Sequence, residues 1–208
     1  MKKQELLKEN FINMRLEYQV VHHKICRKID TIFVDEIKHF KTLLSNFNND
    51  YKCIDDRQIN LISEQLQEIF NSSKIVLMQD YLSRFDKNVE DLTLAMYDFF
   101  NRKLVNINTK SPSKEINKHL MMICKFDTFL FEDKLENDLI DFSNDFIYKY
   151  VNSEDASRDF LHLVKNINHS LVCELKKAIL DSIQDKQDIA SRYNSLNKEV
   201  INRVDVVR

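Results

Sequence analysis

Apolar residues recur at alternating steps of four and three residues between Met78 and Phe99. The positions are Met78, Leu82, Phe85, Val89, Leu92, Met96 and Phe99. This heptad spacing places these side chains along one side of an α-helix, and such a stripe needs a partner to cover it. Much of the remaining chain repeats the spacing. The pattern therefore predicts an all-α protein built from packed helices.

Four long helical regions are predicted, joined by short connections. They cover about residues 3–47, 56–106, 112–151 and 153–203. Candidate breaks or bends within them are Asp30-Thr31, Asn71-Ser72-Ser73 and the polar segment 184–188, because Asp, Asn, Ser and Thr often cap helices. Short connections make consecutive helices antiparallel neighbours. The expected fold is an elongated antiparallel bundle of about four long helices, continuous or interrupted, with coiled-coil-like packing.

Local signals mark where two of these helices begin. Residues 46–56 are rich in Asn and Asp, which favour turns, so this segment is predicted as a loop. Asp55 and Gln58 have the spacing of a capping box, which predicts a helix start directly after Asp55. Ser153 is predicted to cap the last helix, with acidic residues following it in the first turn.

The clearest internal boundary lies at residues 106–113. Ser111-Pro112 combines a capping residue with proline at the first helical position, where a missing N–H costs nothing. The length of 208 residues nevertheless suits one domain. We expect a single helical-bundle domain over residues 1–208, with a sub-boundary at 106–113.

Glycine is absent from the chain, and proline occurs once. Glycine normally serves tight hairpin turns and the loops that bring backbone close to phosphate. Its absence argues against sheets with tight turns and removes the Rossmann and P-loop fingerprints, which depend on it. We expect no cofactor.

Charge and hydropathy narrow the range of partners. Lys and Arg number 31 against 33 Asp and Glu, and the signs alternate along the chain. Nucleic acid is therefore not a favoured partner, although the composition does not exclude it. The apolar runs are far too short to span a bilayer, and no apolar segment follows Met1-Lys2-Lys3 as it would in a secretory signal. We expect a cytoplasmic protein with no membrane span.

The four cysteines lie far apart and form no CxxC motif. They are Cys26, Cys53, Cys124 and Cys173. Small, buried and reduced thiols of a cytosolic protein explain them, and two long-range disulfides are the alternative.

Two pairs of residues have the spacing of metal ligands in helical bundles. Glu36 and His39 match Glu-x-x-His, and Asp159 and His162 nearly match it. The apolar phase places both histidines away from the buried stripes, whereas ligands of a bundle site must point inward. We expect no metal site.

A basic cluster lies in the first predicted helix. It comprises His22, His23, Lys24, Arg27 and Lys28. A solvated helix face explains such a cluster. The functional alternative is contact with phosphate or with an acidic partner.

Two Arg/His pairs resemble the motif of the all-α HEPN ribonucleases, an arginine followed a few residues later by a histidine. Arg15 precedes His22, and Arg158 precedes His162. Leu16 stands where the family has a polar residue, and His162 comes one residue too early. The resemblance implies histidine as general acid or base and arginine as phosphate stabiliser. It supplies the alternative function, a HEPN-like ribonuclease or a nucleic-acid-binding helical protein.

Aromatic residues crowd one region beyond what a single stripe needs. They are Phe126, Phe129, Phe131 and Phe142. Surplus apolar residues beside a stripe indicate a second contact face, for self-association or for a partner helix. The favoured function is therefore a non-catalytic helical scaffold, adaptor or regulatory accessory subunit that acts through protein–protein contacts of its helix faces.

Overall fold

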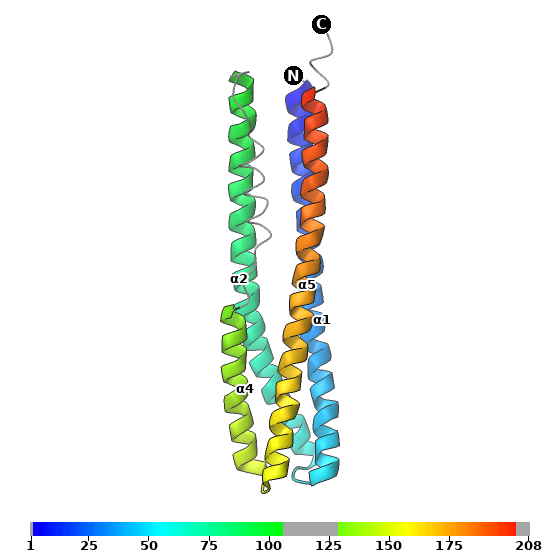
Figure 1. Ribbon diagram of the computed structural model, residues 1–208, viewed down its shortest axis with the longest axis vertical. Coiled ribbons are helices and arrows are strands. Elements are labelled where there is room, and N and C mark those ends of the chain that lie inside the picture. Colours follow the sequence, from blue (N-terminus) through cyan, green and yellow to red (C-terminus); the bar gives the residue numbers. More distant parts are fainter. Residues whose placement is uncertain (1, 106–128, 203–208) are drawn as a thin grey trace. The chain divides into compact units, whose positions relative to one another are not determined.

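The computed structural model describes residues 2–105 and 129–202, and its elements there are all α-helices (Figure 1). They are α1 (Lys2–Tyr51), α2 (Asp56–Val105), α4 (Phe129–Tyr150) and α5 (Glu154–Asn202). The helices pack against each other in a bundle, and no strand occurs in the described part of the chain. The predicted all-α bundle is confirmed.

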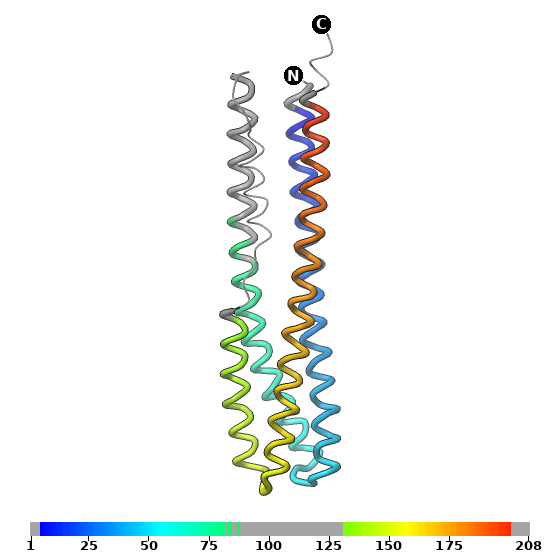
Figure 2. Tube along the Cα trace, in the orientation of Figure 1, coloured from blue at the N-terminus to red at the C-terminus, as the bar shows by residue number. Residues whose placement is uncertain are grey.

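Three helices run without a break through the candidate interruptions. Helix α1 passes through Asp30-Thr31 and continues to Tyr51, so most of the predicted loop at 46–56 is helical. Helix α2 is continuous through residues 71–73, and helix α5 is continuous through residues 184–188. Figure 2 shows the Cα trace of α5 without interruption there. Of the two alternatives, continuous or interrupted helices, the continuous one holds at these three places. Ser73 lies buried in the packed side of α2.

The connection between α1 and α2 is residues 52–55. Lys52 ends α1 with φ of 49°, and its N–H donates to the carbonyl of Asn48 at 2.7 Å. This is the left-handed position after a helix that glycine usually occupies. The N–H of Gln58 then donates to Asp55 Oδ1, and the N–H of Asp55 donates to Gln58 Oε1, both at 2.8 Å. The predicted capping box is confirmed.

The connection between α4 and α5 is residues 151–153. The N–H of Ala156 donates to Ser153 Oγ at 3.2 Å, so Ser153 caps α5 as predicted. Glu154 and Asp155 occupy the first turn, where negative charge is favourable beside the positive end of the helix dipole.

The chain packs as two compact units. Unit 1 comprises Met1–Ile25, Tyr81–Phe126 and Ile179–Arg208, and unit 2 comprises Cys26–Asp80 and Asp127–Ala178. Helices α1, α2 and α5 therefore contribute to both units. The predicted sub-boundary at 106–113 lies outside the described residues, and the single domain stays a prediction.

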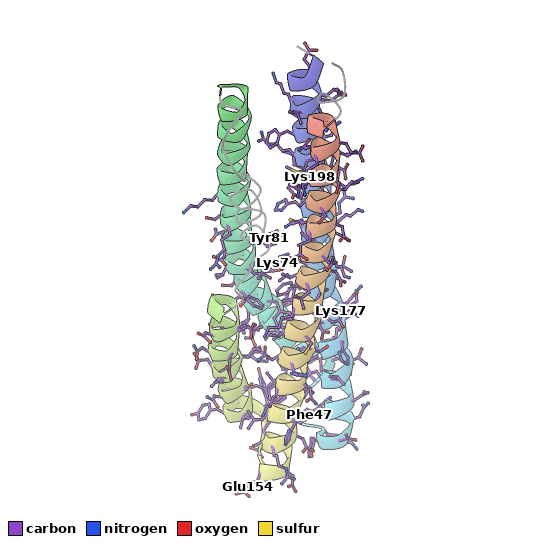
Figure 3. The ribbon with its side chains drawn as sticks, turned by 45° about the horizontal axis from the view of Figure 1, so that its top comes forward. Phe47, Lys74, Tyr81, Glu154, Lys177 and Lys198 are labelled. Carbon is purple, nitrogen blue, oxygen red and sulfur yellow. The ribbon has the colours of Figure 1, made fainter. Side chains whose placement is uncertain are left out.

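The core of unit 2 is built around phenylalanine rings. Phe160 of α5 is fully buried and stacks on Phe146 of α4, with ring centroids 3.7 Å apart. Phe47 of α1, labelled in Figure 3, lies 5.6 Å from the first ring and 6.0 Å from the second. Each buried phenylalanine contributes about 1.5–3 kcal/mol. These rings therefore join three helices at one point of the core.

The core of unit 1 includes a lysine. Among the residues whose side chains are described, its buried hydrophobic members on α1 and α5 are Leu7, Met14, Tyr18, Val21, Ile25, Ile179, Ile189, Ala190 and Tyr193. Lys186 of α5 is 2% exposed, and its Nζ donates to the hydroxyl of Tyr81 on α2 at 2.6 Å. The polar segment 184–188, expected to bend or to project, thus supplies a core residue.

The buried stripe of α2 is displaced by one position from the predicted seam. Leu77 and Tyr81 are buried, whereas Met78 is half-buried. Earlier on the helix, Phe70 is buried and Ile69 is half-buried, and Phe70 precedes the buried Leu77 by seven residues. An α-helix has about 3.6 residues per turn and not 3.5, so positions seven residues apart rotate slowly around the helix. Along a long helix, the residues next to the heptad positions therefore come to face the core. The later seam residues lie outside the described side chains.

Candidate functional site

The side of α1 that faces away from the core of unit 1 carries three exposed aliphatic side chains. Ile12, Leu16 and Val20 are 48%, 54% and 55% exposed. Residues four apart lie on the same side of an α-helix. We call these three residues the outer stripe. Met14 and Tyr18, in the same stretch of α1, are buried, so the helix is apolar on two different sides.

Contacts with α5 hold α1 in this rotation. Tyr193 Oη donates to Glu17 Oε1 at 2.7 Å, and Arg192 forms an ion pair with the same carboxylate. Burial, followed by the Glu17 hydrogen bond, raises the pKa of Tyr193. Asn10 Nδ2 also donates to Asn197 Oδ1 at 3.0 Å. Residues 10 and 17 lie about 100° or more round the helix from Leu16, so these contacts leave the outer stripe uncovered.

Charged residues stand at both ends of the outer stripe. Glu9 precedes it, His23 and Lys24 follow it, and all three side chains are exposed. His23 Nδ1 lies 2.8 Å from the carbonyl oxygen of Gln19, to which it donates. The face therefore carries Glu9 with Lys8 beside it at one end, is apolar in the middle, and carries the basic residues His23 and Lys24 at the other end.

The predicted basic cluster of α1 divides between two environments. The exposed members are His23, Lys24, Arg27 and Lys28. His22 is half-buried, and its ring stacks on Tyr81 with centroids 5.3 Å apart and planes 9° from parallel. His22 therefore takes part in the packing of unit 1, and the other four residues form the solvated face.

Two of the four aromatic residues predicted to form a second contact face, Phe131 and Phe142, lie in the core of unit 2. Phe131 and Phe142 of α4 are buried, in edge contact with Phe33 and Phe40 of α1 at 6.2 Å and 6.0 Å. Phe142 also lies 6.2 Å from Phe160 of α5. Helix α4 contacts two neighbours at once and so needs more apolar positions than one seam supplies. These two residues form no exposed contact face, and the side chains of Phe126 and Phe129 lie outside the described residues.

A hollow of about 720 Å³ lies at the start of α5 in unit 2. Its lining residues are Val151, Asn152, Ser153, Glu154, Ser157, Arg158, Leu161, His162 and Lys165. Arg158 and His162 lie one turn apart and both line it. The guanidinium of Arg158 also pairs with Asp155 at 2.7 Å and lies 3.9 Å from Asp159, so neighbouring carboxylates offset its charge.

The other Arg/His pair does not converge in the same way. Arg15 is exposed on α1, whereas His22 lies against Tyr81. Seven residues of helix separate the two by about 10 Å along the axis. Of the two pairs that resemble the HEPN motif, the structure brings only Arg158 and His162 to one hollow.

The residues with the spacing of metal ligands do not form a metal-binding cluster in the described part of the chain. His39 and His162 are exposed, as the apolar phase predicted, and Glu36 is buried, where it accepts a hydrogen bond from Ser170 at 2.6 Å. Among the residues that the structure describes, no three His, Cys, Asp or Glu side chains are grouped as metal ligands.

The cysteines among the described residues form no disulfide bond. Cys26 and Cys53 are half-buried, and burial raises the pKa of Cys53. Cys173 is exposed on α5, with its sulfur 3.6 Å from His169 Nε2, so the expectation of burial is wrong for this residue.

Hydropathy and comparison with known proteins add two findings. Over the described residues, no helix offers a stretch both long and apolar enough to cross a bilayer. No protein-family model, curated protein or solved structure matches the chain.

Sequence analysis missed the outer stripe, although a signal for it exists. Ile12, Leu16 and Val20 form a second apolar series, at steps of four, between the positions of the buried series. When a helix carries two apolar series on different sides, one series packs in the protein's own core and the other is exposed to solvent.

Proposed function

We propose that the chain is a non-catalytic helical scaffold or adaptor, which binds another protein or a second copy of itself through the outer stripe of α1. The observation that carries this proposal is the half-exposure of three aliphatic side chains in register. Single exposed apolar residues are common on protein surfaces. Three at positions i, i+4 and i+8 lie along one side of the helix, where a partner helix can cover them together.

The strength of such a contact can be bounded. Covering the exposed halves of three aliphatic side chains is worth about 3 kcal/mol, from about 1.5–3 kcal/mol for each complete burial. Association itself costs at least that much in lost freedom of motion. The outer stripe therefore supports a reversible contact, to which the charged ends add register and selectivity.

We also propose that the helices are antiparallel with coiled-coil-like packing. The order of contacts supports this within each unit. The α1–α5 pairs are Asn10 with Asn197 and Glu17 with Arg192 in unit 1, and Glu36 with Ser170 and Tyr51 with Asp159 in unit 2. Partner numbers fall along α5 as they rise along α1. A cytoplasmic accessory subunit of this kind would offer its partner a preformed helix.

The test compares two leucines of similar exposure. Leu16→Glu places a charge in the outer stripe, whereas Leu180→Glu places one at a position of α5 in unit 1 that is 64% exposed. Tagged wild type and both variants are used for pull-downs from the native host, with bound protein quantified by mass spectrometry. Self-association is measured on the same purified samples.

Leu16→Glu should abolish a stoichiometric contact that Leu180→Glu retains. Far-ultraviolet circular dichroism confirms that both variants keep the helical signal. If Leu16→Glu alters neither bound protein nor self-association, the proposed function is wrong.

A second candidate is a HEPN-like ribonuclease or nucleic-acid-binding protein. It is favoured by the hollow at the start of α5, which Arg158, His162 and Lys165 line together. A helix start also attracts phosphate through its dipole. The carboxylates beside Arg158 weaken this candidate relative to the first.

An RNA assay separates the two candidates. His162→Ala should remove cleavage, His169→Ala on the same helix should not, and His22→Ala tests the other pair. Binding of labelled RNA should weaken steeply as salt rises, because phosphate contacts release counterions. Wild type that neither cleaves nor binds RNA would eliminate this candidate.

A further inference from the structure

We propose that the partner of the outer stripe is a second copy of this chain, with two α1 helices packed side by side in opposite directions around Leu16. This inference rests on the proposed function of the outer stripe. It adds the identity of the partner and the register of the contact.

The exposed residues of this face are arranged symmetrically about Leu16. Ile12 and Val20 stand four residues before and after it, and Glu9 and His23 stand seven residues before and after it. The steps from Glu9 to His23 are therefore three, four, four and three, which keeps all five residues near one side of the helix. The spacing of these five positions is therefore the same in both directions along the helix.

A pair in opposite directions uses this symmetry. With Leu16 opposite Leu16 of the second copy, Ile12 faces Val20 on both sides of the centre, and Glu9 faces His23 at both ends. Such a contact uses the same surface on both subunits, related by a two-fold axis, as in most homodimers. The aliphatic centre is then covered on both copies by residues of the same kind.

The charges select the opposite direction over the parallel one. Lys24, exposed beside His23, comes within one position of Glu9 of the second copy, and Lys8, exposed beside Glu9, comes within one position of His23, so at each end Glu9 stands among basic side chains of both copies. In a parallel pair with the same centre, Glu9 would face Glu9 and Lys24 would face Lys24, which is unfavourable. Asn13 and Gln19, which flank the outer stripe, are exposed and uncharged, so they add no repulsion.

The size of the contact sets its expected strength. Residues 9–24 span about 24 Å at 1.5 Å per residue, or between four and five turns of helix. This contact is smaller than a standard protein–protein interface. A dimer that dissociates on dilution is therefore expected.

Sedimentation equilibrium over a wide range of concentrations tests the register directly. The wild type should move from a mass near 24.9 kDa toward twice that value as concentration rises. Leu16→Glu should remain monomeric, and Leu180→Glu should behave as wild type. Glu9→Lys should raise the dissociation constant by about tenfold, because it places like charges together at both ends of the contact.

A charge exchange within one chain provides the decisive variant. Glu9→Lys combined with His23→Glu and Lys24→Glu restores opposite charges at both ends only if the helices run in opposite directions. This triple variant should regain a dissociation constant close to that of the wild type. If it remains as weak as Glu9→Lys alone, the register is wrong and the inference is overturned.

The remaining outcomes separate this inference from the proposed function. A wild type that stays monomeric at every concentration, while Leu16→Glu abolishes capture of another protein, overturns the second copy as partner and leaves the proposed function standing. A dimer that Leu16→Glu does not weaken uses another face, which also overturns the inference. No effect of Leu16→Glu on either mass or capture overturns both.

Discussion

The Nζ of Lys186 donates a hydrogen bond to the hydroxyl of Tyr81 at 2.6 Å, and both side chains are buried in unit 1. The same Nζ lies 4.8 Å from the centroid of the Tyr81 ring. A buried ammonium group is costly unless it is hydrogen-bonded. Tyr81 offsets part of this cost with its hydroxyl oxygen and with the face of its ring.

Removing the hydroxyl of Tyr81 should destabilise the protein. Tyr81→Phe keeps the ring that stacks on His22 and deletes the acceptor of the Lys186 hydrogen bond. A hydrogen bond to a charged group is worth about 1.5–3 kcal/mol, so a loss of that size is expected in urea unfolding. Tyr148→Phe, at a side chain that is 90% exposed, is the matched control and should change nothing. Equal unfolding midpoints for the two variants would contradict the prediction.

Introducing glycine at Lys52 should stabilise the connection between α1 and α2. A non-glycine residue in the left-handed region costs about 1–2 kcal/mol. Glycine removes that cost but returns about 0.5–1 kcal/mol through the freedom of the unfolded chain. Lys52→Gly should therefore raise the free energy of unfolding by about 0.5–1 kcal/mol. Asn49→Gly, inside the last turn of α1, should lower it, and two changes of the same sign would contradict the argument.

Adjacent residues of α5 should respond very differently to truncation. Phe160→Ala removes the ring that stacks on Phe146 and should cost about 3–5 kcal/mol through lost burial and the cavity left behind. Leu161→Ala, at a side chain that is 46% exposed, should cost about 1 kcal/mol or less. Thermal unfolding followed by circular dichroism measures both. Similar losses would mean that Phe160 is not at the centre of the core.

Tyr51 should ionise at a higher pH in the folded protein than an ordinary tyrosine does. The hydrogen bond to the Asp159 carboxylate is the main cause that raises the pKa of Tyr51 to about 12 from an ordinary value of 10.0. The protonated hydroxyl is favoured in the folded state, so its contribution to stability is complete below pH 10.0 and is lost as the pH rises to about 12.

An ultraviolet titration of the tyrosines can detect this raised pKa. Asp159→Asn should return the pKa of Tyr51 toward its ordinary value, and Tyr51→Phe identifies its part of the curve. Superimposable curves for wild type and Asp159→Asn would show that the carboxylate is not the cause.

Local signals in the sequence were predictive because both partners lie close together in the chain. Asp55 and Gln58 are three residues apart, as are Ser153 and Ala156, so capping could be predicted without knowledge of the tertiary fold. The heptad spacing of apolar residues, which repeats along much of the chain, likewise predicted the all-α bundle.

Features that depend on distant residues could not be predicted. Lys186 lies in a polar segment and is buried because Tyr81, 105 positions away, supplies an acceptor. Phe131 and Phe142 look surplus until α1 and α5 are both seen to contact α4. The sequence shows that apolar residues occupy two sides of a helix, but only the fold reveals which side remains uncovered.

The division of three helices between the two units has a consequence for the order in which the chain can fold during synthesis. Unit 2 has all its segments once residue 178 has left the ribosome, although it begins at residue 26. Unit 1 contains residues 1–25, which are synthesised before any segment of unit 2, yet it also includes residues 179–208. Units tend to fold when their segments are complete. Residues 1–25 must therefore wait for their partners in α5 until unit 2 already has all its segments, with the outer stripe of α1 exposed throughout.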